Sequence, residues 1–236
     1  MSFLWFLRHG QAGPRDHYDR LSDLGRRQAA ELGACLVREV PSPAAFYCGS
    51  LRRQRETAAG VLAAYRAAGL ACPEPAIDPR WNEFDLDEVF AGVAPLLAAA
   101  DPAFAAEWRE QRREAESPES AVHRTWTAAD AAVIRAWIED RFPEFEGESW
   151  PGFNRRVLST RAHLLAHGPQ DQVLIATSGT PVAIWIAQAL EIPTRHVMRL
   201  AGASRNCNYS VLRLAPESLE LLSFNVAAHI STRTQR

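Results

Sequence analysis

Phe3-Leu4-Trp5-Phe6-Leu7-Arg8-His9-Gly10 is the stretch of this sequence that decides its fold. A short apolar run that ends at a glycine is typical of a strand buried on both faces. In open α/β sheets, ligands bind outside the carboxyl ends of strands, which is where Arg8 and His9 fall. Taken alone, the dipeptide has two equally good explanations. One is a functional role, and the other is a structural role in which Arg8 forms an ion pair and His9 forms a loop hydrogen bond.

Strands and helices alternate along the chain on both sides of a helical middle segment. Residues 21–40 predict a helix with Ser22 as its N-cap, and residues 45–49 predict a short strand. Residues 50–69 predict a second helix, which Gly69 closes. From residue 172 an apolar strand, a Ser-Gly turn and an apolar helix follow, and residues 208–225 predict a hairpin. This alternation predicts an α/β fold with a mostly parallel sheet and helices on both faces.

The middle segment, residues 86–147, has a helical composition and few strand signals. We therefore expect one α/β domain over residues 1–236, with residues 86–147 as an all-helical insertion, or cap, within it. Pro102 and Pro118 follow residues suited to helix N-caps, and the charged residues 107–119 predict a solvated face. We expect the tryptophans of this segment to be core residues: Trp108, Trp126 and Trp137.

The bulk composition excludes several classes of partner. The 236 residues are 47% hydrophobic, which suffices for one substantial core. A net charge of -2 provides no basic field, so we expect neither nucleic acid nor a membrane as a partner. All 26 basic residues are arginine, whose forked donors suit phosphate. The sequence shows neither a leader pattern nor a membrane-spanning apolar run, which favours the cytoplasm, and it indicates no oligomeric state.

The cysteines give no sign of a disulfide framework or of a metal site. Cys35, Cys48, Cys72 and Cys207 are scattered, without a CxxC pair or zinc-finger spacing. We expect four reduced thiols, no metal and no cofactor.

Five segments, taken in order, resemble the histidine phosphatase superfamily, also called phosphoglycerate mutase-like. They are LRHGQA (7–12), LSDLGRRQAAELG (21–33), SLRRQRETAAG (50–60), WNEFDLDEV (81–89) and GESWPGFNRRV (147–157). The resemblance covers most of the chain apart from the helical insertion. It implies a three-layer α/β/α sandwich whose central histidine is phosphorylated during turnover.

The resemblance implies that His9 is the phosphate acceptor and that Arg8 and Arg53 bind the phosphoryl group. Neutral imidazole is a nucleophile at physiological pH, and guanidinium groups stabilise the charge of a transferring phosphoryl group. The family shows an arginine four residues before a threonine in this helix, and that position corresponds to Arg53 before Thr57. Since only one face of that helix can point into a pocket, we expect the neighbouring Arg52 and Arg55 to be solvated.

The resemblance places the proton donor at Glu83. A carboxyl group there would protonate the leaving oxygen and then, as a carboxylate, activate water. For this task its pKa should be raised by apolar neighbours such as Trp81 and Phe84. The competing carboxylates are Asp85, Asp87 and Glu88.

One position departs from the family pattern. The family carries a second histidine, followed by glycine, at the end of the strand that here continues into Ser178-Gly179. A hydroxyl donates a neutral hydrogen bond, so the loss is about 1–3 kcal/mol, roughly ten- to a hundredfold in rate, and Ser178→His should restore it. Backbone amides of Gly179 and Thr180, or a swing of His229, could offset the loss, although a capping or surface role suits His229 better.

Two other interpretations of these polar residues are weaker. Ser178 as a hydrolase nucleophile is disfavoured, because the nucleophile elbow requires a glycine two positions earlier and Ala176 stands there. Asn208 and Ser210 are interpreted as turn or edge-strand residues rather than catalytic ones.

The sequence thus favours a metal-independent phosphomonoesterase that acts on a small-molecule or other phosphoester through phosphorylated His9. In this hypothesis, Arg8, Arg53 and Ser178 surround the phosphate and Glu83 shuttles protons. Two alternatives stay open. One is mutase-type phosphoryl transfer, and the other is a phosphate-binding pseudoenzyme that lost its chemistry with the second histidine.

Overall fold

The computed structural model describes residues 1–13, 19–115 and 127–231. Within them a six-stranded sheet has the order β3-β2-β4-β1-β5-β6. Its strands are β1 (Ser2–Arg8), β2 (Ala45–Cys48), β3 (Ala76–Ile77), β4 (Gln172–Thr177), β5 (Tyr209–Leu214) and β6 (Leu219–Val226). The first four in spatial order are parallel, and β5 and β6 form the expected antiparallel hairpin. The prediction of a mostly parallel sheet is confirmed.

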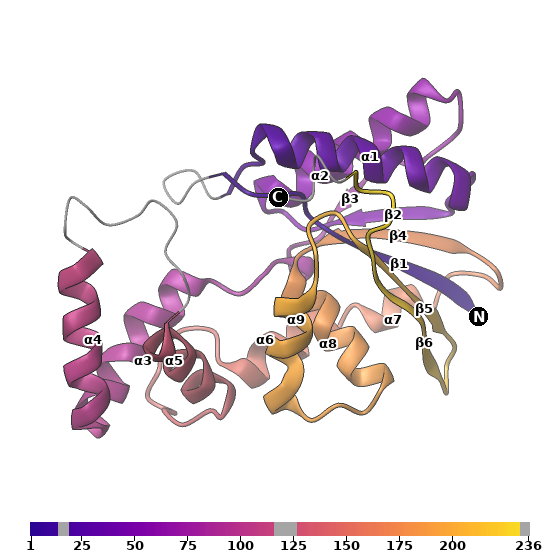
Figure 1. Ribbon diagram of the computed structural model, residues 1–236. Helices are drawn as coiled ribbons and strands as arrows, with labels where there is room; N and C mark the ends of the chain where they lie inside the picture. The colour runs from indigo at the N-terminus through magenta and orange to yellow at the C-terminus, as the bar shows by residue number, and fades with distance from the viewer. Residues whose placement is uncertain (14–18, 116–126, 232–236) are drawn as a thin grey trace. The chain divides into compact units, whose positions relative to one another are not determined.

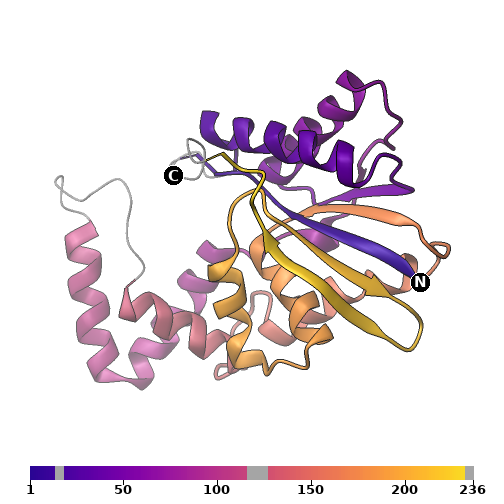
Figure 2. The ribbon, with the colours of Figure 1, turned by 45° about the vertical axis from the view of Figure 1, so that its right-hand side comes forward.

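Helices cover both faces of this sheet, which confirms the three-layer architecture. α1 (Asp23–Glu39) and α2 (Arg52–Ala67) lie on one side. On the other side lie α7 (Arg161–Leu164), α8 (Gly179–Ala189) and α9 (Val197–Ala203), as Figure 1 shows and Figure 2 repeats after rotation.

Local signals account for the helix ends that the sequence indicated. Ser22 caps α1, because its side chain accepts a hydrogen bond from the Gly25 amide at 3.0 Å. Gly69 follows the end of α2 with a φ of +68°, a left-handed conformation that glycine adopts without strain. These two residues therefore perform the functions predicted from their types.

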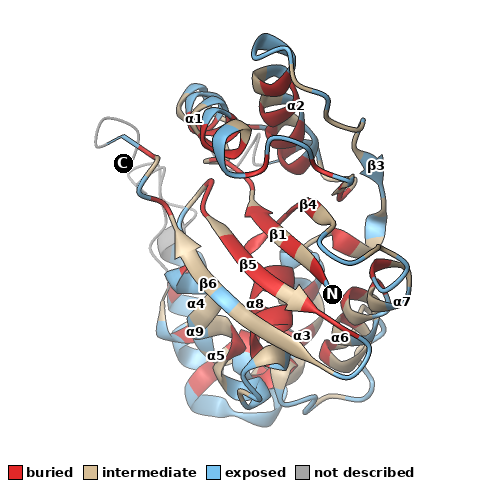
Figure 3. Ribbon diagram, turned by 90° about the vertical axis from the view of Figure 1, so that its right-hand side faces the viewer, coloured by how far each residue is buried: buried red, intermediate tan, exposed pale blue. Residues whose placement is uncertain are grey.

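The core lies around the two central strands. In Figure 3 the middle of the sheet is buried, and Leu4, Phe6 and Leu7 of β1 are fully enclosed. Phe3 and Trp5 are only half-buried, so β1 is covered more completely on one face than the expectation of two buried faces implied. β4 is buried at every position after its first residue.

The connections of β1 and β4 diverge at their carboxyl ends. From β1 the chain passes through α1 to β2, toward the β3 edge of the sheet. From β4 it passes through α8 to β5, toward the β6 edge. The two strands are neighbours, and the register pairs Arg8 with Thr177 at their ends. Such a switch point is where open α/β sheets bind ligands.

The chain divides into two compact units. One comprises residues 1–83 and 156–236, and the other comprises residues 84–155, which is wider on both sides than the expected insertion at 86–147. The second unit contains α3 (Leu86–Ala100), α4 (Pro102–Ala115), α5 (Ala128–Ile138) and most of α6 (Trp150–Leu158). Its described residues are helical or irregular, with no strand. The expected helix start at Ser117-Pro118 and Trp126 fall outside the described residues.

Aromatic side chains form the core of the second unit. Trp137 lies 4.5 Å from Phe84 between ring centroids and also contacts Trp150 and Phe153. Trp108 stacks on neighbouring phenylalanine rings of the same unit. Trp137 is buried and packs as a core residue, as predicted, whereas Trp108 is only half-buried. The unit is wider than 86–147 because Phe84 and the start of α6 belong to this cluster.

Two further expectations can be compared with the structure. All four cysteines are free in the structure, and three of them are buried. Among the described helices, none combines the length and the apolar character needed to cross a bilayer.

Candidate active site

His9 lies at the carboxyl end of β1 and is 4% exposed. Its amide donates to the Thr177 carbonyl at 2.9 Å, and its ring Nδ1 lies 2.8 Å from the Gly10 carbonyl oxygen. A carbonyl can only accept, so Nδ1 carries the proton and Nε2 keeps its lone pair. Burial, together with Arg53 and Arg8, lowers the pKa of His9 to about 3. The ring is thus neutral at physiological pH, and a neutral imidazole nitrogen with a lone pair has the chemistry of a nucleophile.

The two arginines that lower this pKa approach from different elements. Arg8 ends β1; its guanidinium donates to the Ser204 carbonyl, and Nε lies 3.6 Å from where a Cβ on Gly179 would be. Arg53 is buried in the first turn of α2, where Nη1 donates to Asp19 at 2.9 Å. The structure therefore brings together the positive charges of β1 and α2, near the start of α8.

A hydrogen-bond chain holds the end of β1 against α2. The Gly10 amide donates to Thr57 Oγ1 at 3.0 Å, and Thr57 Oγ1 donates to the Arg53 carbonyl at 2.8 Å. Glycine is required at position 10, because a Cβ there would lie 2.5 Å from the Gly25 carbonyl oxygen. As predicted, Arg52 and Arg55 are exposed.

Glu83 is brought to the start of α8. Its Oε2 accepts a hydrogen bond from the Thr180 amide at 3.0 Å. The Thr180 amide is thus bound to a carboxylate here, whereas the sequence had suggested it for phosphate. The rival Asp85 caps α3, and Asp87 and Glu88 are exposed on the first turn of that helix. Glu83 belongs to the same unit as His9, whereas these three belong to the other.

Ser178 is fully buried at the N-cap of α8. Its Oγ accepts a hydrogen bond from Gln54 Nε2 at 2.9 Å, and the same nitrogen donates to the Trp81 carbonyl at 3.1 Å. Because an amide N–H can only donate, the hydroxyl proton of Ser178 is left to donate elsewhere. The residue is therefore arranged as a neutral donor at the end of β4.

A model of the histidine phosphatase superfamily (branch 1) matches residues 4–137 and 119–227 of the chain. The chain belongs to this superfamily. Membership supports phosphoryl-transfer or phosphatase activity. No protein of curated function matches the sequence significantly.

Solved structures of other proteins show a similar fold. The structure called mycobacterial hydrolase 2 is 22% identical with a TM-score of 0.62, over 99% of this chain and 94% of its own. A putative α-ribazole-5′-P phosphatase from Escherichia coli is 19% identical with a TM-score of 0.60, over 96% and 98%. Mycobacterial glucosyl-3-phosphoglycerate phosphatase is 22% identical with a TM-score of 0.59, over 96% and 99%.

Sequence reasoning missed two structural supports of this candidate site. One is Gln54, whose only signal was its place beside Arg53 on the buried face of α2. The other is the segment 204–208, whose signal was a run of mostly polar residues before a strand. Asn206 and the Cys207 amide both donate to the His9 carbonyl, at 3.2 and 3.3 Å.

His229 occupies a structural position rather than a place in the candidate site. Its Nε2 lies 2.9 Å from the Cys207 carbonyl oxygen, and its ring stacks on Tyr209. Burial lowers its pKa, so it adds no positive charge at neutral pH. A swing into the site would break these contacts. This agrees with the capping or surface role that the sequence favoured.

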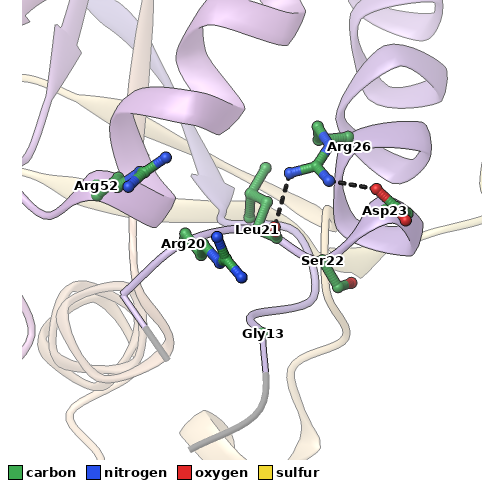
Figure 4. Close-up of a pocket in the computed structure, with 7 residues that line it drawn as sticks. All are labelled: Gly13, Arg20, Leu21, Ser22, Asp23, Arg26 and Arg52. Carbon is green, nitrogen blue, oxygen red and sulfur yellow. Dashed lines mark hydrogen bonds and ion pairs between the residues drawn. The ribbon is translucent and has the colours of Figure 1, made fainter. Parts of the chain in front are cut away.

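A cavity of about 320 Å³ opens between the starts of α1 and α2 (Figure 4). Arg20, Arg26 and Arg52 line it, but Arg26 is bound to Asp23 and to the Leu21 carbonyl. None of the sequence-predicted site residues lines this cavity.

Proposed function

We propose that this histidine phosphatase is a phosphomonoesterase that forms a phosphohistidine at His9 without a metal ion. His9 Nε2 attacks phosphorus while the leaving oxygen takes a proton from Glu83. The Glu83 carboxylate then removes a proton from water, which attacks the phosphohistidine and releases inorganic phosphate. Atoms and protons balance, and both residues return to their starting states.

The observation that carries the proposal is the state of the His9 ring. Its Nδ1 proton is held by Gly10, and its pKa of about 3 keeps Nε2 unprotonated beside two guanidinium groups. Those charges lie where a transferring phosphoryl group develops negative charge. Ser178 adds a neutral donor, so we expect a slower enzyme than one with a charged group there.

The substrate that this chemistry favours is a small-molecule phosphoester. The net charge of -2 supports neither nucleic acid nor a membrane as a partner. Four free thiols support a reducing compartment, the cytoplasm.

Release of phosphate from p-nitrophenyl phosphate tests the proposal. We expect His9→Ala to abolish turnover, whereas His196→Ala, a substitution outside the site, should leave it unchanged. Quenching the reaction of a labelled substrate with alkaline detergent should leave base-stable label on His9, which later treatment with acid removes. Unchanged turnover in His9→Ala would rule out the nucleophile. Label on His9 with return to an isomeric product would indicate a mutase, and phosphate binding without label would indicate a pseudoenzyme.

A further inference from the structure

Four consecutive carbonyl groups precede Glu83, and each accepts a hydrogen bond from a side chain of another element. Nη1 of Arg156 in α6 lies 3.1, 3.2 and 3.1 Å from the carbonyl oxygens of Pro79, Arg80 and Asn82, and its two N–H groups are shared among these three acceptors. The remaining carbonyl, that of Trp81, accepts from Thr177 Oγ1 at 2.5 Å and from Gln54 Nε2 at 3.1 Å.

This turn needs such donors because of its local structure. Residues Pro79–Trp81 form one turn of 3-10 helix, and Asn82 follows in an extended conformation. The last carbonyls of a helical turn have no intrahelical partner, and a cation at that end is favoured electrostatically. A guanidinium supplies both the donors and the charge, and charge-assisted hydrogen bonds are stronger than neutral ones.

The side chain of Asn82 ties the same turn to the loop before α2. Its Oδ1 accepts from the Ser50 amide at 2.7 Å, and its Nδ2 donates to Ser50 Oγ at 2.8 Å. The backbone that leads into Glu83 is thus bound to β4, α2 and α6. Glu83 itself reaches the Thr180 amide at 3.0 Å.

We propose that Arg156 is a positioning residue for Glu83. Arg156 holds the backbone carbonyls on both sides of Trp81 in one conformation. The carboxyl group of Glu83, which follows Asn82, therefore stays at the start of α8. The inference rests on the proposed function in one respect, the role of Glu83 as proton donor.

Leaving-group chemistry separates this role from a general effect on folding. p-Nitrophenolate is a stable anion and departs without a proton, whereas an alkoxide needs one from a general acid. If the Glu83 carboxyl group is displaced from its position, the hydrolysis of glycerol phosphate should therefore slow much more than that of p-nitrophenyl phosphate. A loss of folded protein would slow both reactions by the same factor.

The experiment compares kcat/KM on both substrates for Arg156→Ala, Arg156→Lys, Glu83→Gln and the double variant Arg156→Ala/Glu83→Gln. Arg155→Ala is the matched control, since Arg155 is the exposed neighbour on the same helix. We expect Arg156→Ala to lower kcat/KM on glycerol phosphate at least about tenfold more than on p-nitrophenyl phosphate. Arg156→Lys should recover part of the loss, and the double variant should be no slower than Glu83→Gln.

Hydrogen exchange provides a readout that does not depend on activity. The Thr180 amide is bound to Glu83, so it should exchange faster in Arg156→Ala than in the wild type, and should not change in Arg155→Ala. Equal losses on both substrates with unchanged Thr180 exchange would overturn the inference, as would additive losses in the double variant. If Arg156→Ala does not fold, the lysine variant carries the same comparisons.

Failure of the proposed function gives a different pattern. If Glu83→Gln slows both substrates equally, Glu83 is not the proton donor and that part of the proposed function falls. Thr180 exchange in the Arg156 variants still decides whether Arg156 positions the carboxylate.

Discussion

Ser178 is the residue at which we expect this chain to depart from the family pattern, and the structure changes what a substitution by histidine should do. The residue is 0% exposed and its hydroxyl is bound to Gln54. An imidazole needs the space that the Gln54 side chain fills, and overpacking a buried site costs about 1–3 kcal/mol. The gain expected of Ser178→His from the sequence therefore requires a second change.

We predict that Ser178→His alone is no faster than the wild type, and that Ser178→His/Gln54→Ala is faster than the single variant by about tenfold. The shortened residue 54 makes room for the ring, whose N–H adds a hydrogen-bond donor at the end of β4. kcat/KM on p-nitrophenyl phosphate measures this, with Gln54→Ala and the exposed Ser42→Ala as controls. A faster single variant would contradict the steric argument.

At the scale of elements, α1 and α2 pack closely because glycine lies at their contact. A Cβ on Gly33 would lie 2.7 Å from the Ala64 Cβ, and one on Gly60 would lie 2.9 Å from the Ala29 Cβ. The two helices cover the same face of the sheet and carry Ser22 and Arg53 at their starts. Their spacing therefore contributes to the position of the candidate site.

Gly33→Ala should lower the free energy of unfolding by about 1–3 kcal/mol, because the methyl group forces the helices apart. Gly202 in α9 provides the matched control, since a Cβ there meets nothing within 4 Å. Gly202→Ala should be neutral or stabilising by up to about 1 kcal/mol, as alanine has the higher helix propensity. Urea unfolding of both variants measures the difference, and equal midpoints would show that the α1–α2 contact accommodates the methyl group.

Elements with strong local signals were predictable from the sequence, whereas contacts between residues far apart in the sequence were not. β1, the Ser22 cap and the β5–β6 hairpin follow from apolar runs and turn residues. The strand β3 has two exposed residues and no such pattern. The Gln54–Ser178 bond joins residues 124 positions apart, and no local pattern encodes a contact of that range.

At the scale of the whole molecule, the candidate residues come from the two sequence segments that together form one compact unit. Arg8, His9, Arg53 and Glu83 precede the helical unit in sequence, and Ser178 and Arg156 follow it. The sheet joins the two segments through the β1–β4 pairing. The family motifs could place each residue on its element, but only the strand order shows that their elements meet.

Folding of the whole molecule should become less favourable in acid because of His9. Its pKa is near 6.5 in the unfolded chain and about 3 in the folded protein, where burial and two arginines oppose the cation. Between these values the unfolded state binds the extra proton, so stability falls as pH falls. Above about pH 6.5 the ring is neutral in both states and the effect is absent.

From pH 7 to pH 5, His9 should cost the wild type about 2 kcal/mol in free energy of unfolding. His229 and His163 also have lowered pKa values and act in the same direction, so the comparison must be made against a variant that keeps them. His9→Gln removes the His9 contribution alone. Urea unfolding at both pH values, in buffers without phosphate, should therefore show a smaller acid loss for His9→Gln than for the wild type. An equal loss in the two proteins would mean that His9 accepts its proton in the folded state, against the neutral nucleophile on which the proposed chemistry depends.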